Sequence, residues 1–439
     1  MTVQQLVPRV GAVEVGEELR RLHEAPHRAA GPFDALRIDF SDALSRAILR
    51  DPRSRPFPQM VAVGFWLRRA EIHRLADRFA ALEEAGAIRV PRGLAFHVPP
   101  TNVDTVFLYS LIVSFLVGNR NVVRVSPNRS GEQGALLCEL LREVLAEERF
   151  SAFADELTVI SYSHEAEPTE LLSRAADVRL LWGGDESIDR LQAVPVRPGT
   201  HDLTFGDRFS FAVLRPEAVL EPDQRSLHTL AEELYNDAYW FHQLACSSPR
   251  LIVWVGSPED VERARRVLFE ELSQVIAAKG YALEPGAAIS KLNFMYGALI
   301  DRPVESVYRS GNELAVLGLS DLDEFDRSHP GAGLFFEARA DALEDLVGFI
   351  SRKDQTLTAH GFTGSELAAF ARALQGRGID RIVDFGDALT FSSLWDGYDL
   401  LAELTRTVTV AQAARPARPP GRRRAATLTR CPHSAATID

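Results

Sequence analysis

Several features that would point to particular classes of protein are missing from this sequence. Its 439 residues include only three cysteines and no Cys-x-x-Cys pair, which argues against a disulfide framework and against a thiolate zinc site. Such sparse cysteine usage fits a reducing compartment, and we expect the chain to be cytoplasmic. The formal net charge of −12 disfavours nonspecific binding to nucleic acid or anionic lipid, although a local basic patch remains able to hold a polyanionic substrate.

Long apolar segments and one familiar glycine motif are missing as well. The most apolar run, residues 106–117 (VFLYSLIVSFLV), has twelve residues, whereas a membrane span needs about 20, so it predicts a buried helix and no membrane span. The N-terminus has no basic start followed by an apolar stretch, and no secretory signal is expected. The absence of Gly-x-Gly-x-x-Gly counts against an ordinary Rossmann dehydrogenase.

What the sequence does contain, from Gly93 onward, is an alternation of β-branched runs and apolar or amphipathic runs. The former predict strands and the latter predict helices. A regular succession of the two implies a parallel, doubly wound sheet, whose ligand binds at the carboxyl ends of the strands. The expected strands are 93–98, 121–125, 157–161 and 178–182, and the expected helices are 106–117, 132–148 and 169–176, with Gly183-Gly184 opening one more.

A second succession begins after about residue 207, so the chain is expected to hold two α/β domains. Its expected strands are 209–214 and 251–255, and its expected helices are 227–243 and 258–278. From residue 411 the composition shifts to alanine, proline and arginine, which predicts a disordered basic tail over 411–439 that is solvated and does not bind nucleic acid.

The three cysteines have different settings. Cys138 falls on the apolar face of an expected helix and should pack in the core, and Cys431 lies in the expected tail without an assigned function. Cys246, within FHQLACSSPR, stands where serines and a proline end a helix-like run. From the residues alone it is either a core residue or a nucleophile, which needs access and a lowered pKa or a nearby base. His242 would share its helix face only if the helix extends that far.

Three stretches of the sequence bear on this choice: 99–126 (PPTNVDTVFLYSLIVSFLVGNRNVVRVS), 238–250 (AYWFHQLACSSPR) and 380–401 (DRIVDFGDALTFSSLWDGYDLL). In order and spacing they resemble the acyl-CoA reductase family typified by the fatty acid reductase of bacterial bioluminescence, within the aldehyde dehydrogenase superfamily. The resemblance covers roughly residues 60–410. It implies an α/β, aldehyde dehydrogenase-like fold, with a doubly wound parallel cofactor domain and a second α/β catalytic domain.

The resemblance also sets the expected domain boundaries. Residues 61–207 would bind the cofactor and would be rejoined by residues 379–410, while residues 208–378 would form the catalytic domain. Residues 1–60 would precede both as an N-terminal extension, and the tail over 411–439 would follow.

Two residues match catalytic positions of the resembled superfamily. Cys246 matches the nucleophile that takes up the acyl group, and Asn102 matches the asparagine whose side-chain amide holds the oxyanion. A donor at that oxygen is typically worth roughly 100- to 1000-fold in rate. From the sequence alone Asn102 would instead be a helix N-cap, because it stands just before the apolar helix.

For a nicotinamide cofactor the resemblance points to two loops. Arg124 stands where the superfamily has its ribose-binding lysine, with Ser126 two residues on, and Gly183-Gly184 match a turn beside the cofactor. The change from lysine to arginine keeps the charge but alters its geometry. With Arg120 and Arg129 nearby, Arg124 would suit the extra phosphate of NADP; the alternative for those two neighbours is solvated surface charge.

One departure from the superfamily pattern bears on the reaction. Hydrolytic aldehyde dehydrogenases carry a glutamate that activates water, and Thr204, in LTFGDRF, stands in its place. Threonine cannot serve as that base near neutral pH, so an acyl-enzyme would wait for hydride. The resemblance therefore implies NADPH-dependent reduction of a long-chain fatty acyl-CoA to the aldehyde, through an S-acyl-cysteine at Cys246.

Other functions remain open at this point. They are an NAD(P)-dependent aldehyde dehydrogenase acting oxidatively, a cysteine acyltransferase without nicotinamide chemistry, and a silent scaffold for partner binding. The resemblance implies an acyl-CoA or acyl-protein substrate and an acyl-protein synthetase as partner in a fatty acid reductase complex. We expect a homo-oligomer, and neither a metal ion nor nucleic acid.

Overall fold

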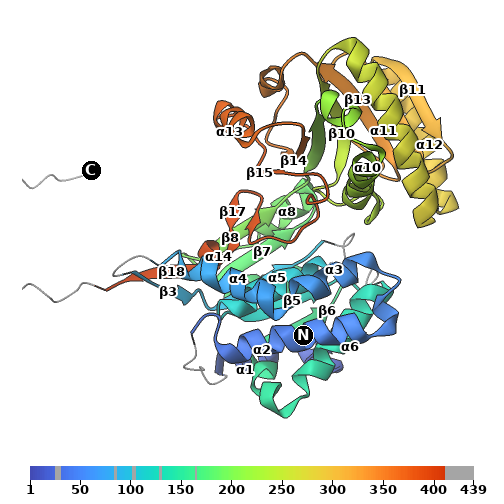
Figure 1. Cartoon of the computed structure of the whole chain (residues 1–439). Helices are drawn as coiled ribbons and strands as arrows, with labels where there is room; N and C mark the ends of the chain where they lie inside the picture. The colour runs from blue at the N-terminus through green and yellow to red at the C-terminus, as the bar shows by residue number, and fades with distance from the viewer. Residues whose placement is uncertain (25–30, 84–86, 101–104, 128–130, 164–165, 411–439) are drawn as a thin grey trace, which may run out of the picture.

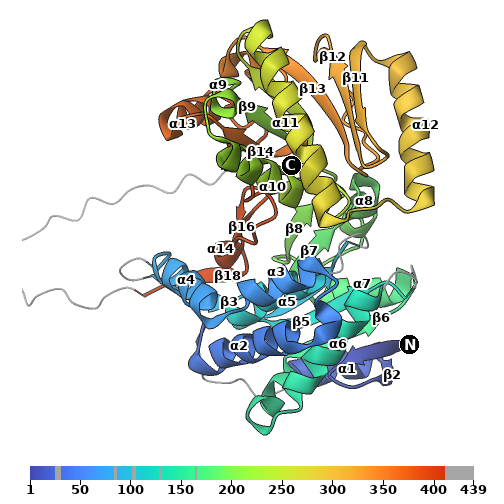
Figure 2. The same cartoon turned by 45° about the vertical axis from the view of Figure 1, so that its right-hand side comes forward.

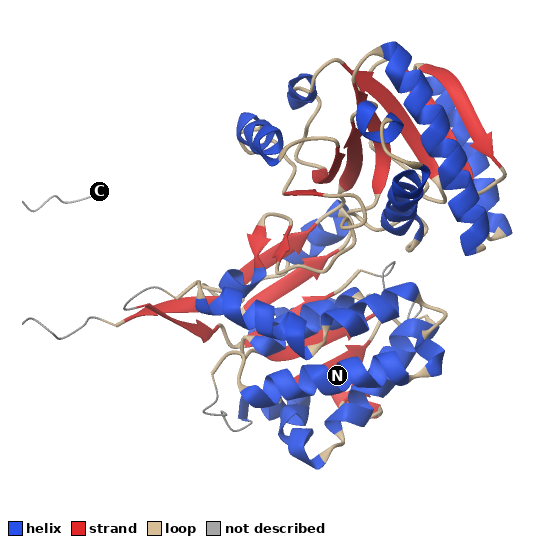
Figure 3. Cartoon of the chain, in the orientation of Figure 1, coloured by secondary structure: helices blue, strands red, loops and turns tan. Residues whose placement is uncertain are grey.

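The chain folds into two α/β bodies, with a C-terminal segment that runs back from the second to the first (Figure 1). The structure is a computed structural model that describes residues 1–24, 31–83, 87–100, 105–127, 131–163 and 166–410. Each body is built on a seven-stranded sheet. Figures 2 and 3 show the helices packed along these sheets.

The first sheet is formed by β1 (Thr2–Val7), β2 (Gly11–Glu14), β4 (Leu94–Val98), β5 (Arg120–Val125), β6 (Leu157–Ser161), β7 (Val178–Trp182) and β8 (His201–Phe205). Its spatial order is β2-β1-β6-β5-β4-β7-β8, and the five strands from β4 to β8 are parallel. The chain runs outward from β4 to β6 and then returns to the other side of β4, so the strand order reverses there. Strands β1 and β2, within the expected N-terminal extension, are antiparallel additions to this sheet.

Helices cover both faces of the first sheet, so its central strands are buried on both sides. Val123 of β5 packs into one core and its neighbour Val122 into the other. On one face, the first core is formed with α2 (Ala35–Arg50), α3 (Pro58–Trp66), α4 (Arg69–Ala80), α5 (Val106–Leu116), α6 (Glu132–Leu145) and the 3-10 helix η2 (Glu148–Asp155). On the other face, the second core is formed with α1 (Val15–Glu24) and α7 (Ala166–Ala175). The 3-10 turn η1 (Pro52–Ser54) links α2 and α3. All eleven residues of α5 are buried, as its apolar sequence predicts.

The second sheet contains β9 (Phe209–Leu214), β10 (Pro249–Val255), β11 (Val304–Ser310), β12 (Leu314–Leu319), β13 (Leu334–Ala340), β14 (Asp354–His360) and β15 (Arg381–Val383), in the order β11-β12-β13-β10-β9-β14-β15. All pairings except β11 with β12 are parallel. One face is covered by α9 (Glu217–Leu220), α10 (Gln224–Tyr239) and α11 (Pro258–Lys279), and the other by α12 (Pro285–Asp301), η3 (Leu343–Val347) and α13 (Gly364–Ala373).

The segment after β15 crosses back to the first body. It forms the hairpin of β16 (Leu394–Trp395) and β17 (Tyr398–Asp399), then α14 (Leu400–Glu403) and β18 (Thr405–Thr409), which pairs with β3 (Ala87–Pro91). Trp395 and the leucines of α14 belong to the first core. The hairpin therefore lies at the junction of the two bodies.

The sequence predictions for the two parallel sheets are confirmed, and β6 matches its expected residues 157–161. Cys138 is 4 % exposed in the first core, as expected of a packing residue. Within the described part of the chain, no helix is long and apolar enough to cross a membrane, and no cluster of side chains fits a metal ion.

Candidate active site

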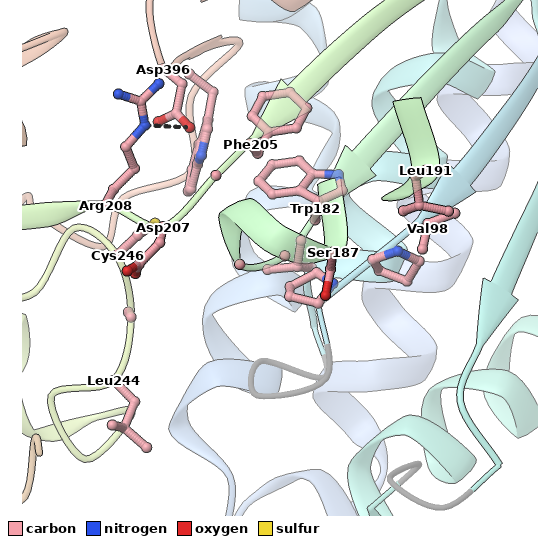
Figure 4. A pocket seen from close by; sticks show the side chains of 18 of the residues that line it. Val98, Trp182, Ser187, Leu191, Phe205, Asp207, Arg208, Leu244, Cys246 and Asp396 are labelled. Atoms are coloured by element: carbon pink, nitrogen blue, oxygen red, sulfur yellow. Dashed lines mark ion pairs between the residues drawn. The ribbon is translucent and has the colours of Figure 1, made fainter. Parts of the chain in front are cut away.

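A cavity of about 1100 Å³ opens where the two bodies meet. One wall comes from the carboxyl ends of the first sheet's strands, a second from the loop before β10, and a third from the returning segment (Figure 4). Ligand sites in proteins usually measure roughly 300–1,000 Å³, so this cavity is at the upper end of the usual size.

The first wall lies at the reversal of strand order. Val98 ends β4, Trp182 ends β7 and Phe205 ends β8, and all three line the cavity. The connections that leave the adjacent strands β4 and β7 run in opposite directions, toward β5 and β8, and open a crevice at this edge of the parallel sheet. The four residues expected to bind a cofactor line the same cavity: Arg124, Ser126, Gly183 and Gly184.

The Gly183-Gly184 turn presents bare backbone to this cavity. Gly183 has φ of 155°, which side chains other than glycine rarely adopt, and Gly184 precedes α8 (Asp185–Gln192). A Cβ atom at Gly184 would meet nothing within 4 Å, so packing does not require glycine there. The turn leaves room for a ligand to approach the main chain.

Arg124 is a buried cation in the cavity wall. Its Nη2 donates to the carbonyl of Tyr162 at 3.2 Å, and its guanidinium lies 5.3 Å from the centre of the Tyr162 ring. Its Nε has no hydrogen-bond partner, and no carboxylate acts on its charge among the residues that the structure describes. Burial lowers the pKa of this guanidinium. An anionic ligand group in the cavity would satisfy both the charge and the unpaired N–H.

The second wall carries Cys246 in the loop between α10 and β10, hereafter the nucleophile loop (residues 240–248). Hydrogen bonds to the carbonyl groups of this loop fix its position. Ser210 Oγ donates to the Cys246 carbonyl at 2.7 Å, and Ala332 N donates to the His242 carbonyl at 2.8 Å. The Arg250 guanidinium reaches the carbonyls of Gln243 and Ala245 at 3.4 and 3.3 Å. Although the loop belongs to the second body, the Cys246 side chain packs against the first core.

The expected continuation of the helix to Gln243 is wrong. Helix α10 ends at Tyr239, and His242 and Gln243 have φ of 52° and 62°, a left-handed conformation that costs roughly 1–3 kcal/mol per residue. His242 therefore does not share a helix face with Cys246. Its Nδ1 lies 3.0 Å from the Tyr281 hydroxyl, and the ring does not line the cavity.

The Cys246 thiol is free and partly exposed. Burial raises its pKa to about 11, and the carboxylate of Asp396 adds to the rise, while the side chains of Gln355 and Arg250 oppose it. The thiol is therefore neutral near pH 7. Reaction at neutral pH requires a group that removes its proton during attack.

This electrostatic setting gives a prediction for the free protein. Alkylation of Cys246 by iodoacetamide should be slow at neutral pH and should rise about tenfold per pH unit as the thiolate population grows toward the pKa of about 11. The measurement is a pH series with the alkylated cysteine identified by mass spectrometry, so that Cys138 and Cys431 are counted separately. A rate that levels off near pH 9, as expected of an ordinary thiol with a pKa of about 8.5, would contradict the raised pKa.

Two carboxylates in the cavity were not predicted from the sequence. Asp207 follows β8 and Asp396 lies in the β16–β17 hairpin, and both line the cavity beside Arg208 (Figure 4). Thr204, the residue in the place of the hydrolytic glutamate, does not line it. The Trp-Asp-Gly sequence at residues 395–397, in the third resembling stretch, is the sequence feature that could have pointed to Asp396.

Other expected residues lie elsewhere or are not described. Asn102 and Arg129 lie outside the described residues, although Pro100 and Val106, on either side of Asn102, line the cavity. Arg120 begins β5, at the end of the strand away from Ser126, and donates to the His23 carbonyl at 3.0 Å. It does not line the cavity.

The two-body α/β fold is that of aldehyde dehydrogenases. A putative aldehyde dehydrogenase from Burkholderia cenocepacia superposes with a TM-score of 0.61 at 14 % identity, covering 93 % of this chain and 96 % of that one. Aldehyde dehydrogenase 21 from Physcomitrella patens gives a TM-score of 0.64 at 12 % identity, covering 91 % of each chain. The aldehyde dehydrogenase-like α/β fold expected from the sequence is confirmed.

Within that class, the chain belongs to the acyl-CoA reductase (LuxC) family, whose model matches residues 69–407. A long-chain acyl-protein thioester reductase from Aliivibrio fischeri is 21 % identical over 305 residues, which are 67 % of this chain and 59 % of that protein. Long-chain acyl-protein thioester reductase 2 from Photobacterium leiognathi is 25 % identical over 204 residues, 46 % of this chain and 38 % of that protein. The matches thus span about three fifths and two fifths of the length of these relatives.

Proposed function

We propose that the chain reduces a long-chain fatty acyl thioester, in the first place acyl-CoA, to the aldehyde with NADPH, through an acyl group held on Cys246. The observation that supports this most is the shared cavity, which contains Cys246 together with Arg124, Ser126 and the Gly183-Gly184 turn. Membership of the acyl-CoA reductase family and the thioester reductases among its relatives support the same class of reaction.

In the proposed reaction, different residues bind the acyl group, stabilise the oxyanion and position the nucleophile. The Cys246 sulfur adds to the thioester carbonyl, and departure of the carrier thiol leaves an S-acyl-enzyme. Asn102 and the backbone N–H of Cys246 hold the oxyanion. Ser210 and Arg250 fix the nucleophile loop, so the sulfur keeps its place in the cavity. When bound, the reduced nicotinamide supplies the hydride that converts the acyl group to an aldehyde.

NADPH is proposed as the cofactor because of residues in the first wall of the cavity, opposite Cys246. The buried Arg124 guanidinium, with its unpaired Nε, suits a phosphate group, and the Gly183-Gly184 turn admits a ligand close to the main chain. NADPH is proposed over NADH because the extra phosphate would supply the anion that Arg124 lacks.

Replacement of Arg124 by leucine tests that assignment. The affinity for NADPH should fall by about 10- to 100-fold, the value of a hydrogen bond to a charged group, while the affinity for NADH changes much less. Dissociation constants for both nucleotides can be measured by fluorescence titration. Arg120→Leu is the matched control, because Arg120 lies on the same strand outside the cavity. Equal losses for both nucleotides would show that Arg124 contacts a part they share.

The reaction itself is tested by mixing the protein with palmitoyl-CoA and NADPH and following absorbance at the nicotinamide band. Loss of absorbance with formation of aldehyde supports the proposal. Activity only with aldehyde and NADP⁺ would favour the oxidative alternative, and transfer of the acyl group without any change in absorbance would favour an acyltransferase. A protein that takes up no acyl group from palmitoyl-CoA and oxidises no NADPH would favour the scaffold alternative.

The remaining expectations accompany this proposal. An acyl-protein thioester as natural substrate, an acyl-protein synthetase as partner, a homo-oligomeric state and a cytoplasmic location stay predictions. So do the functional domain boundaries at residues 61–207, 208–378 and 379–410.

A further inference from the structure

Asp396 is a buried carboxylate in the cavity wall to which the proposed function assigns no task. With Gly397 it forms the two-residue turn of the β16–β17 hairpin, where the φ values of 48° and 76° match a type I′ turn. Its side chain is only 2 % exposed, and the Arg208 Nε lies 3.8 Å from its Oδ2 (Figure 4). Gln355 of β14 donates from Nε2 to its Oδ1.

Gln355 connects this carboxylate to the nucleophile. Its side chain donates to Asp396 and lies close enough to Cys246 to lower the pKa of the thiol, and its Oε1 has no hydrogen-bond partner in the part of the chain that the structure describes. The amide group of Gln355 thus lies near both the carboxylate and the sulfur, and the charge of Asp396 is near enough to raise the pKa of the thiol. Both side chains line the cavity that would receive the thioester.

The charges around the pair leave Asp396 able to exchange a proton near neutral pH. Burial raises its pKa to about 6, opposed by Arg208 and Gln355. Such a carboxyl is ionised at pH 7 and still returns a proton readily. The charged or titratable groups that face the pair are Arg208, Asp380 and Tyr109 around Asp396, and Arg250 and Arg381 around Cys246. The second carboxylate of the cavity, Asp207, also lies near Cys246 and interacts with Arg250 (Figure 4).

We propose that Asp396 accepts the thiol proton of Cys246 during attack on the thioester and returns it to the departing thiolate of the acyl carrier. The S–H bond breaks as the new S–C bond forms, the proton passes to the carboxylate, and the old C–S bond breaks. The carrier thiolate then takes the same proton, so charge and atoms balance without another reactant. The inference rests on the proposed function of Cys246.

The unaltered chain gives the first test. Its acylation by radiolabelled palmitoyl-CoA, measured without NADPH from about pH 5 to about pH 9, should rise with one ionisation near pH 6 and then stay level, because the carboxylate removes the proton. Alkylation by iodoacetamide should instead keep rising toward the thiol pKa of about 11. An acylation rate that follows the alkylation profile overturns the proposal.

Asp396→Asn gives the second test, because the two reactions should change in opposite directions. Acylation at pH 7 should slow by about 100-fold or more and should then rise steadily with pH. Alkylation at pH 8 should become faster, because loss of the negative charge lowers the thiol pKa. A merely structural role would slow both reactions or neither, and either result overturns the proposal.

Asp380→Asn is the matched control, since it removes a nearby carboxylate that does not line the cavity. Its acylation rate at pH 8 should stay within about threefold of the unaltered chain. If Asp396→Asn does not fold, the pH profile of the unaltered chain still decides. An unaltered chain that is never acylated refutes the proposed function and this inference together, whereas acylation without an ionisation near pH 6 refutes the role of Asp396 alone.

Discussion

Cys246→Ala should abolish aldehyde formation and covalent labelling by radioactive acyl-CoA, while NADPH still binds. The expected loss in turnover is on the order of a million-fold, comparable to removal of a serine protease nucleophile. Binding of NADPH should survive because the residues proposed to hold it, Arg124 and the Gly183-Gly184 turn, lie on the opposite wall of the cavity. Absorbance at the nicotinamide band, gel detection of the label and a fluorescence titration measure the three outcomes.

Cys138→Ala is the matched control for that experiment. Cys138 is 4 % exposed within the first core, so its loss should lower the melting temperature without affecting the label on Cys246. The label on the unaltered chain should map to Cys246 by mass spectrometry. Label that persists in Cys246→Ala and maps to Cys138 or Cys431 would contradict the proposed mechanism.

Asn102→Ala should lower the rate of acylation by roughly 100- to 1000-fold, or about 2.7–4 kcal/mol of transition-state stabilisation, with little change in NADPH affinity. The physical reason is that charge develops on the carbonyl oxygen only in the transition state, so a donor there contributes to rate and not to cofactor binding. Pro100 and Val106, on either side of Asn102, line the cavity that holds Cys246.

The helix-cap interpretation of Asn102 predicts a different change. Loss of a cap costs about 1 kcal/mol of stability and leaves acylation per folded molecule nearly intact. Melting temperature and single-turnover acylation, measured on the same preparation, separate the two. Asn102→Asp adds information, because a carboxylate still caps a helix but repels an oxyanion. A lower melting temperature with normal acylation in Asn102→Ala would remove Asn102 from the mechanism.

The parallel strands could be predicted from the sequence because they are buried on both faces. Strand β6, for example, consists of five buried residues, and its β-branched residues Thr158, Val159 and Ile160 indicate a strand. Strand β1 could not be recognised in this way, because its residues alternate between exposed and buried. The end of α10 was also missed. The left-handed backbone at His242 and Gln243 depends on hydrogen bonds to Ala332 and Pro249, and no local glycine or proline marks it.

The candidate site was only partly predictable for a related reason. Arg124 and the Gly183-Gly184 turn lie at or just after the carboxyl ends of strands, where a doubly wound sheet places its ligand. Asp396, Gln355 and Arg208 come from a hairpin, a strand and a loop far apart in the sequence, and no spacing relates them. An Asp-Gly pair predicts a turn, but the direction of its carboxylate is set by the neighbouring body.

Cys246 belongs to a loop of one body and packs against the core of the other, so a coenzyme that changes the contact between the two bodies would also change the acidity of the thiol. If NADPH lowers the thiol pKa by one unit, the ionised enzyme must bind NADPH about tenfold more tightly than the neutral enzyme. The NADPH dissociation constant would then fall as the pH rises toward the pKa of the thiol. Reciprocity of this kind would let the bound coenzyme prepare the nucleophile before any acyl donor arrives.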